Sequence, residues 1–118
     1  MGQLDGVKVV ELSTFIAAPS CARILASYGA DVIKVEAPRG DDLRQVALSY
    51  YYPHPDAEGN NAGFDVQNFN KKGLAINLKD PKGMEAFLKL LETADVFVTN
   101  NRVKSLVKMG LDYDTLHA

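Results

Sequence analysis

The sequence predicts an α/β protein whose open, mainly parallel, Rossmann-like sheet is flanked by helices. Short runs rich in β-branched residues alternate along the chain with longer runs that repeat apolar residues at helical spacing. Two such strands joined by one helix form a βαβ unit, which is nearly always parallel and right-handed. At 118 residues the chain fits one domain and is long enough to bury a packed core.

The first βαβ unit is expected near the start of the chain. The run VKVVEL at 7–12 is too short for an amphipathic helix and is typical of a buried strand. Pro19, in the turn FIAAPS at 15–20, predicts that a helix starts there, and Gly29 predicts where this helix ends. The run DVIKVE at 31–36 is expected to form the second strand.

The segment 37–69 interrupts this regular pattern. It is rich in turn-forming residues, shows no sustained period and contains Tyr50 to Tyr52, which are candidates for one wall of a pocket. We expect a long loop within the domain, and loops of that length usually serve a function or move. Order returns with a third strand, LAINL at 74–78, and Asp80 followed by proline predicts the next helix start.

The last part of the chain repeats the alternation once more. The run ADVFV at 94–98 is expected to form a fourth strand, and the helical run after it ends at Gly110. Asp112 is a good cap for one more helix, but the chain stops at Ala118 with that helix barely begun. We therefore expect residues 1–118 to be the N-terminal part of a larger domain.

Composition and charge exclude several classes of protein. A net charge of −2 with 47% hydrophobic residues gives no sign of a nucleic-acid partner. No run approaches the ~18 consecutive apolar residues of a membrane span, and the single cysteine, Cys21, excludes an internal disulfide and a multi-cysteine zinc site. We expect a cytoplasmic protein with no membrane partner. Lysines gathered within 70–82 leave room for a local anion site.

The turn FIAAPS follows a strand at the place where many α/β proteins hold a nucleotide, yet it contains no glycine. The GxGxxG turn that binds a pyrophosphate is therefore missing. Glu36 ends the second strand about 20 residues after the turn, like the acid that binds ribose in dinucleotide folds. An NAD-binding oxidoreductase fragment stays open as an alternative, although the missing glycines weigh against it.

Three separated blocks of the sequence point, in order, to one family. They are LDGVKVVELSTFIAAPSCARILASYGADVIKVEAPRGDDLR at 4–44, NFNKKGLAINLKDPKGMEAFLKLLETADVFVTN at 68–100 and MGLDYDTL at 109–116. Together they resemble the N-terminal segment of the family III (CaiB/BaiF) CoA-transferases. Within that family they are most similar to enzymes of anaerobic amino-acid fermentation that pass CoA between 2-hydroxy acids and enoyl or aryl-enoyl acids.

The resemblance implies an activity and its partners. Family members move CoA from an acyl-CoA to a carboxylic acid through an aspartate, which forms an anhydride and then an aspartyl-CoA thioester. The resemblance places this aspartate beyond Ala118, so it implies no catalytic residue within this chain. It implies acyl-CoA and CoA as substrates, no tightly bound cofactor, and a homodimer. A non-catalytic module that binds CoA or a partner subunit remains an alternative.

The resemblance also implies CoA contacts, each with a plainer structural alternative. Small side chains in the turn let the long, partly apolar CoA approach, or they simply pack a strand against a helix. Arginines after the second strand offer a planar guanidinium that suits a phosphate, and lysines before the third strand meet phosphates as point charges. The alternative for both groups is that they are solvated surface charges. Carboxamides and an arginine after the fourth strand hold a pyrophosphate at the carboxyl end of the sheet, or they cap a helix.

The candidate CoA-binding residues are Ile16, Ala17 and Ala18 in the turn, Ala37, Arg39 and Arg44 after the second strand, Asn70, Lys71, Lys72, Ile76, Asn77, Leu78 and Lys79 around the third strand, and Asn100, Asn101, Arg102 and Lys108 after the fourth. Ala37 stands where many relatives place an arginine that stacks on adenine, and Arg39 or Arg44 is a substitute for it. Lys108 stands where relatives place an arginine near the 3′-phosphate.

Overall fold

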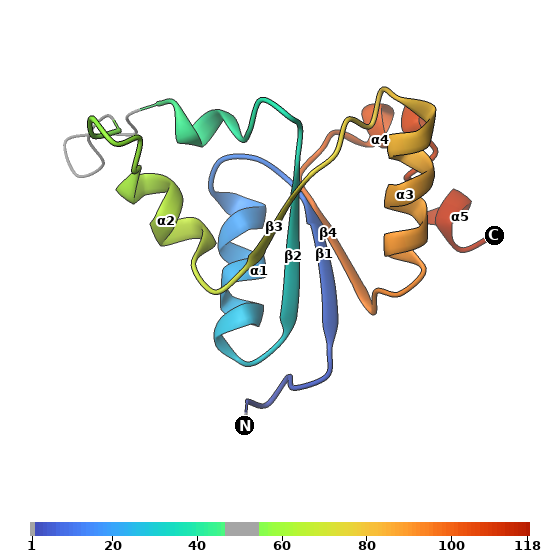
Figure 1. Ribbon diagram of the computed structural model, residues 1–118. Helices are drawn as coiled ribbons and strands as arrows, with labels where there is room; N and C mark the ends of the chain where they lie inside the picture. The colour runs from blue at the N-terminus through green and yellow to red at the C-terminus, as the bar shows by residue number, and fades with distance from the viewer. Residues whose placement is uncertain (1, 47–54) are drawn as a thin grey trace.

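A computed structural model describes residues 2–46 and 55–118 and has the predicted α/β architecture (Figure 1). Tyr50 to Tyr52 lie outside the described residues. Within these ranges the parallel strands are β1 (Lys8–Leu12), β2 (Asp31–Glu36), β3 (Lys72–Ala75) and β4 (Val96–Thr99), in the sheet order β3-β2-β1-β4. The helices are α1 (Ala17–Ser27), α2 (Ala62–Asn68), α3 (Pro81–Leu91), α4 (Val103–Met109) and α5 (Tyr113–Leu116), with a 3-10 helix at Asp42–Arg44.

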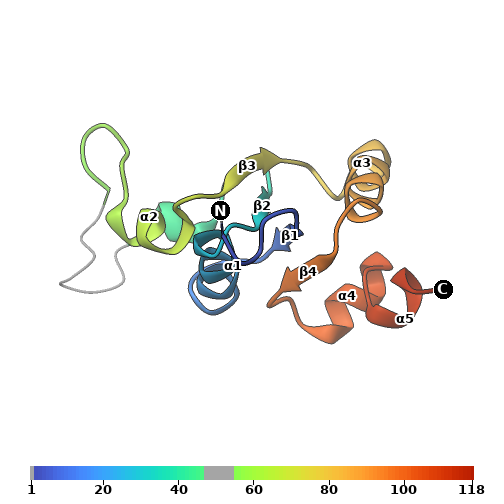
Figure 2. The same ribbon diagram turned by 90° about the horizontal axis from the view of Figure 1, so that it is seen from below.

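Helices cover both faces of the sheet. Figure 2 shows α1 and α2 on one side and α3, α4 and α5 on the other. Because side chains alternate along a strand, Val9 and Val32 point toward α1 and pack with Ala22, whereas Val10 packs with Phe87 of α3 on the other face. Each face therefore has its own hydrophobic core, as a parallel sheet requires.

The helix signals in the sequence are confirmed. The Asp80 side chain accepts a hydrogen bond of 2.8 Å from the Lys82 N–H and caps α3. Gly110, with a left-handed φ of 68°, ends α4. Asp112 caps α5. Helix α1 begins at Ala17, slightly earlier than predicted, so most of the FIAAPS motif forms the first turn of the helix.

The third strand lies earlier in the chain than the sequence predicts. Strand β3 covers 72–75 instead of 74–78 because its partner β2 ends at Glu36, which pairs with Ala75. One more bond follows, from the Ile76 N–H to the Glu36 carbonyl at 2.9 Å. Without further partners the chain turns, and the expected second half of the strand becomes the loop that leads into α3.

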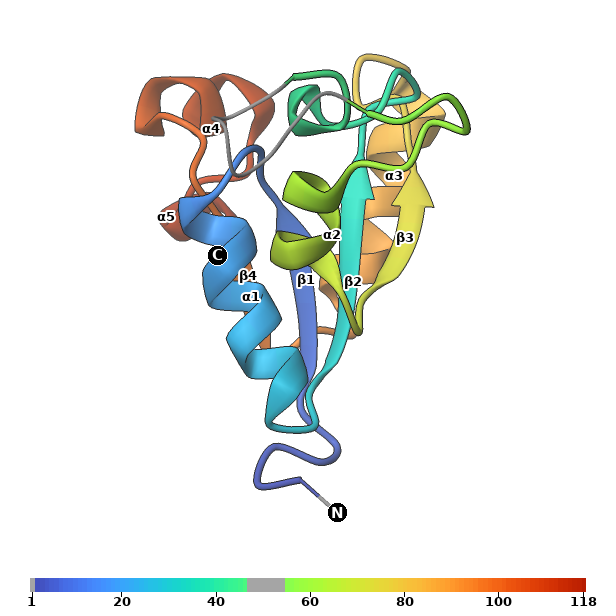
Figure 3. The ribbon, with the colours of Figure 1, turned by 90° about the vertical axis from the view of Figure 1, so that its left-hand side faces the viewer.

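The segment 37–69 holds more regular structure than the sequence predicts. It contains the 3-10 helix and α2, which lies beside α1 (Figure 3). The Asn61 side chain accepts a 3.1 Å hydrogen bond from the Phe64 N–H to cap α2, and its amide donates to the Leu43 carbonyl at 2.8 Å. Helix α2 has only 7 residues, too few to show a clear apolar period in the sequence.

The connections of this sheet reverse direction between β1 and β4. From β1 the chain moves outward to β2 and β3, and then crosses back through α3 to β4 on the other side of β1. Open α/β sheets bind ligands outside the carboxyl ends of their strands at such a reversal. Among the described residues, no helix is long and apolar enough to cross a membrane.

Candidate functional site

A cleft of about 660 Å³ opens beside the carboxyl ends of β1, β2 and β3, facing α3 and α4. Six of its lining residues are ones that the sequence analysis assigns to CoA. The residues that line it are Leu12, Ala37, Ile76, Asn77, Leu78, Lys79, Met84, Lys108 and Met109. The fold thus brings candidate residues from the second, third and fourth strand regions to one place.

The cleft combines an apolar floor with two cationic side chains. Leu12, Ile76 and Met84 belong to the core beneath it. Among the described residues no carboxylate lies within 4.0 Å of the amino groups of Lys79 or Lys108, because neither lysine takes part in an ion pair. An apolar floor with free positive charge suits a ligand that has both a flat apolar part and phosphates.

Two smaller hollows adjoin the cleft at Ala37. One of about 140 Å³ extends over the ends of β1 and β2 to Asn101, and one of about 420 Å³ extends along β3. Both are lined by Arg39, whose guanidinium is largely exposed and lies 3.1 Å from the Asp42 carboxylate. Ala37 lines all three spaces, so they adjoin one another at its small side chain.

Arg44 is held by neighbouring side chains. Its guanidinium donates two hydrogen bonds of 2.8 Å to the Glu36 carboxylate and lies 3.7 Å from the ring centroid of Phe64. Burial raises the pKa of the Glu36 carboxyl, but hydrogen bonds from Arg44 and the Asp41 N–H, together with the nearby positive charges, bring it below the ordinary value. A carboxylate occupied in this way is not free to bind ribose, which weakens the dinucleotide alternative.

The turn between β1 and α1 faces the same edge. Ile16 and Ala17 are exposed, while Ala18 is buried against the sheet. Phe15 has a φ of 62°, a left-handed conformation that is rare for a bulky residue. The backbone of Thr14 is bound on both sides by one carboxamide: the Asn100 Nδ2 donates to the Thr14 carbonyl at 2.8 Å, and the Asn100 Oδ1 accepts from the Thr14 N–H at 3.2 Å.

Lys71 is placed differently from the sequence prediction. Its amino group lies 2.7 Å from the Glu11 carboxylate and donates to the Pro19 carbonyl at 2.9 Å and the Asn68 side chain at 2.8 Å, with the side chain only 2% exposed. Burial lowers the pKa of the Lys71 ammonium, and its contact with Glu11 offsets only part of that effect. These contacts use all three of its donors, which leaves none for a phosphate of CoA.

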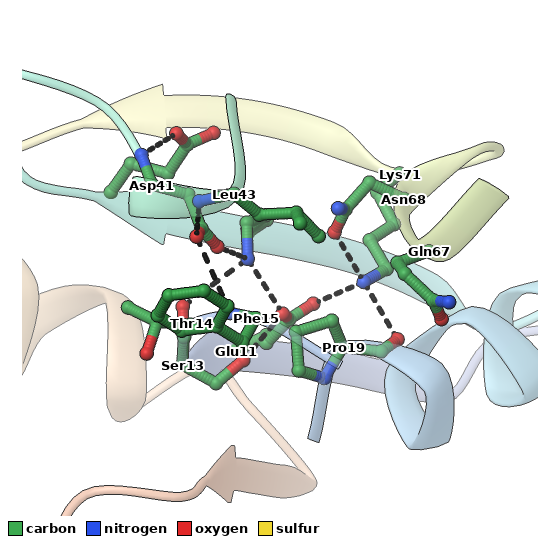
Figure 4. Close-up of polar contacts among 12 residues, drawn as sticks. Glu11, Ser13, Thr14, Phe15, Pro19, Asp41, Leu43, Gln67, Asn68 and Lys71 are labelled. Carbon is green, nitrogen blue, oxygen red and sulfur yellow. Dashed lines mark hydrogen bonds and ion pairs between the residues drawn. The ribbon is translucent and has the colours of Figure 1, made fainter. Parts of the chain in front are cut away.

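Lys71 belongs to a buried charge cluster made of Glu11, Lys34, Asp41 and Lys71 (Figure 4). The Lys34 amino group lies 3.0 Å from both the Glu11 and the Asp41 carboxylates. The four formal charges sum to zero, and each side chain is no more than 2% exposed. Pairing lowers the free-energy cost of burying these charges, which would be very large for any one of them alone.

The sequence analysis missed this cluster, although the strands contain a signal for it. Two strands that are otherwise rich in valine and isoleucine each contain an inward charge of opposite sign, Glu11 in VKVVEL and Lys34 in DVIKVE. These two residues are direct partners in the parallel pair of β1 and β2. Opposite charges at matching positions inside two buried strands indicate a buried ion pair, whereas the other matching pair, Lys8 and Asp31, lies at the strand starts and is exposed.

The other candidate residues lie outside the cleft. Lys72 is at the amino end of β3, where its amino group lies 2.7 Å from the Asp31 carboxylate. The Asn70 side chain donates to the Ala26 carbonyl at the end of α1. Arg102 is exposed at the start of α4. The Asn70–Lys72 motif therefore lies outside the cleft, which is lined by Lys79 and Lys108.

The fold and the site define a parallel α/β protein with a ligand cleft at the carboxyl edge of its sheet. The family model of CoA-transferase family III matches residues 4–118. The chain belongs to this family. The recognition made from the three sequence blocks is confirmed.

Named relatives and a solved structure agree with this assignment. The chain is 51% identical to (R)-2-hydroxy-4-methylpentanoate CoA-transferase of Clostridioides difficile over 113 residues, covering 96% of this chain and 28% of that protein. It is 50% identical to cinnamoyl-CoA:phenyllactate CoA-transferase of Clostridium sporogenes, covering 95% of this chain and 27% of the relative. The crystal structure of a CAIB/BAIF family protein from Brucella suis matches with a TM-score of 0.84 and 38% identity, covering 98% of this chain and 30% of that one.

The chain thus spans less than a third of the length of these relatives.

Proposed function

We propose that residues 1–118 form the N-terminal part of the CoA-binding domain of a CoA-transferase. The observation that carries this proposal is the cleft at the carboxyl edge of the sheet, with its apolar floor and with Lys79 and Lys108, which have no ion-pair partner in the described part of the chain. The nucleotide of CoA would lie against Ile76 to Leu78, and its 3′-phosphate near Lys108. The shape and charge of the cleft support this placement.

The turn at the start of α1 would contact the other end of CoA. Exposed Ile16 and Ala17 present small or apolar surface and backbone near the ends of β1 and β4. Asn101, at the small hollow between Ala37 and the turn, would meet the connecting pyrophosphate or pantetheine. The meeting of the three hollows at Ala37 supports an extended ligand.

In the parent protein the reaction would use an aspartate outside this segment. Its carboxylate attacks the acyl carbonyl of the donor and expels the CoA thiolate, which leaves a mixed anhydride. The thiolate then attacks the aspartyl carbonyl and releases the donor acid, giving an aspartyl-CoA thioester. The incoming carboxylic acid regenerates the aspartate by the reverse steps. The role of the present segment is to hold CoA through both transfers.

We propose a 2-hydroxy acid as the acceptor, in amino-acid fermentation. This is supported by the names of two relatives at about half identity, which act on 2-hydroxy-4-methylpentanoate and phenyllactate. We further propose that the whole protein is a cytoplasmic homodimer. The edge strands β3 and β4, both partly exposed here, would then be covered by the remaining chain or by the partner.

A calorimetric titration tests the binding half of the proposal. The 118-residue chain is titrated with CoA, with 3′-dephospho-CoA and with NAD. Binding of CoA, weaker binding of dephospho-CoA and none of NAD would support the assignment of Lys108 to the 3′-phosphate. Binding of NAD without CoA would favour the dinucleotide alternative, and a folded chain that binds neither would refute a CoA half-site within these residues.

The activity half needs the whole protein. Transfer of CoA from cinnamoyl-CoA or a branched 2-enoyl-CoA to phenyllactate or 2-hydroxy-4-methylpentanoate is followed by chromatography of the CoA esters. Transfer to the 2-hydroxy acid, with succinate as the control acceptor, is the expected result. Transfer to succinate alone would overturn the acceptor class while leaving the family assignment in place.

A further inference from the structure

The buried charge cluster does more than pair its own charges, because it also binds backbone next to the site. The Lys34 amino group donates to the Ser13 carbonyl at 3.2 Å. The Asp41 carboxylate accepts the Phe15 N–H at 3.3 Å. These two bonds fix the backbone at the point where it leaves β1 and turns toward α1 (Figure 4).

Lys71 extends the same arrangement to the first turn of α1. Its amino group donates to the Pro19 carbonyl at 2.9 Å while it pairs with Glu11 at 2.7 Å. It reaches this carbonyl from the loop before β3, which lies more than 50 positions away in the sequence. The start of α1 is thereby tied to β1 and to the loop before the edge strand β3.

Asn100 completes the set of contacts from the opposite side. By binding both backbone groups of Thr14, it ties the turn to the end of β4. Between these contacts lies Phe15, with its left-handed φ of 62°. A bulky residue keeps such a conformation only where its surroundings determine it strongly.

A contribution to folding stability does not by itself explain why this protein buries four charged side chains. Buried ion pairs gain little over apolar residues of similar volume, because desolvation of the charges cancels much of their attraction. Apolar side chains, however, have no directional donors or acceptors for the carbonyls of Ser13 and Pro19 or the N–H of Phe15. What the charges supply here is a defined geometry for the turn.

We propose that the buried charge cluster, together with Asn100, is a positioning device that fixes the turn at Ser13–Ile16 and the start of α1. Through the turn it sets the place of Ile16, Ala17 and Ala18 at the ligand edge. This inference rests on the proposed function insofar as the positioned surface is the one that meets CoA. None of the cluster residues touches the ligand in this scheme.

The test removes one ion pair without leaving a net buried charge. In the double variant Glu11→Gln, Lys71→Met, the remaining Lys34 and Asp41 still neutralise each other, but Pro19 loses its donor. The matched control is Glu85→Gln, Lys89→Met, which removes an exposed Lys–Glu pair at 2.8 Å on α3, away from the turn. Asn100→Ala is a second, exposed variant that releases Thr14 without disturbing the buried charges.

Two readouts separate positioning from general stability. Amide hydrogen exchange is measured over 14–20 and over the helices on the other face, and CoA affinity is measured by calorimetry. We expect exchange over 14–20 to accelerate about tenfold or more in the double variant and in Asn100→Ala, with α3 unchanged, and CoA to bind about tenfold more weakly. The control variant should match the unmodified chain in both readouts.

Exchange that stays unchanged over 14–20, or that rises equally throughout the chain, would overturn the positioning role. If the double variant does not fold, Asn100→Ala decides the question by the same exchange criterion. If the unmodified chain does not bind CoA, the proposed function fails for this segment, but the exchange comparison still tests whether these side chains hold the turn.

Discussion

Two pairs of lysines, one in the buried charge cluster and one at the cleft, lie in opposite environments. Lys34 and Lys71 lie beneath α1 with side chains no more than 2% exposed, and each pairs with a buried carboxylate. Lys79 and Lys108 are exposed at the cleft on the other side of the sheet, without a described ion-pair partner. Burial and counter-charge therefore decide whether a lysine is held inside the protein or stays available to solvent and to the proposed ligand.

The largest effect, a loss of stability, is expected when one buried lysine is removed. In Lys34→Met the two carboxylates of Glu11 and Asp41 keep only Lys71 as a counter-charge. Removing one member of a buried ion cluster typically destabilises a protein by about 3–5 kcal/mol. Urea unfolding measures the change, and the exposed Lys89→Met is the control. A loss below about 1 kcal/mol would mean that the cluster is not sealed from water.

The next effect concerns the wall of the cleft. A Cβ on Gly83 of α3 would lie 2.1 Å from the Asn77 carbonyl oxygen, so Gly83→Ala must push the helix away from the loop that lines the cleft. We expect destabilisation of about 1–3 kcal/mol, although alanine is the better helix former, together with weaker CoA binding.

Gly73→Ala in β3 is the matched control for this change, because no atom lies within 4 Å of the added methyl group. Thermal unfolding of both variants makes the comparison. Equal stability of the two would contradict the close approach between α3 and Asn77.

A smaller effect is expected from the exposed lysines, and it should appear in binding instead of stability. Lys108→Ala should weaken CoA binding about 3- to 10-fold while changing the free energy of unfolding by less than about 0.5 kcal/mol. If Lys108 meets the 3′-phosphate, the variant should bind CoA and dephospho-CoA equally. Lys104→Ala, exposed on the same helix but outside the cleft, is the control, and an equal loss there would reduce the effect to general charge attraction.

The smallest expected effect is a pH dependence at Glu36. Its pKa is lower in the folded chain than its ordinary value, so the unfolded chain binds more protons as the pH falls through this range. Its contribution to stability is therefore present at neutral pH and is lost as the pH falls through the folded-state pKa. Because Arg44 is half-exposed, we expect no more than about 1 kcal/mol.

The variant Glu36→Gln checks this sign. It should be slightly less stable than the unmodified chain at pH 7, and the difference should shrink in acid. Urea unfolding at several pH values gives both quantities. A difference that grows as the pH falls would show that the sign is wrong.

The order and type of the elements could be predicted from local sequence. The runs at 7–12 and 31–36 form strands because they are short and β-branched, and Asp80, Gly110 and Asp112 mark helix ends through contacts with their own neighbours. The cleft lies at the carboxyl edge because the strands are parallel, so that all their carboxyl ends meet at one edge of the sheet. Local chemistry is sufficient for such features because the interacting atoms are close in the sequence.

The parallel α/β class and the family could be read from the sequence alone, whereas the structure was needed to show that Ala37, Ile76 to Lys79 and Lys108, among the candidate residues, line one cleft. The tertiary structure also sets where β3 stops, since that depends on where β2 ends. It buries Lys71 in an ion pair, while Lys79 has no ion-pair partner among the described residues. Whether a lysine is buried or exposed depends on carboxylates and carbonyls that come from distant elements. The Asn70–Lys72 motif by itself does not contain that information. Burial and pairing are properties of the packed chain.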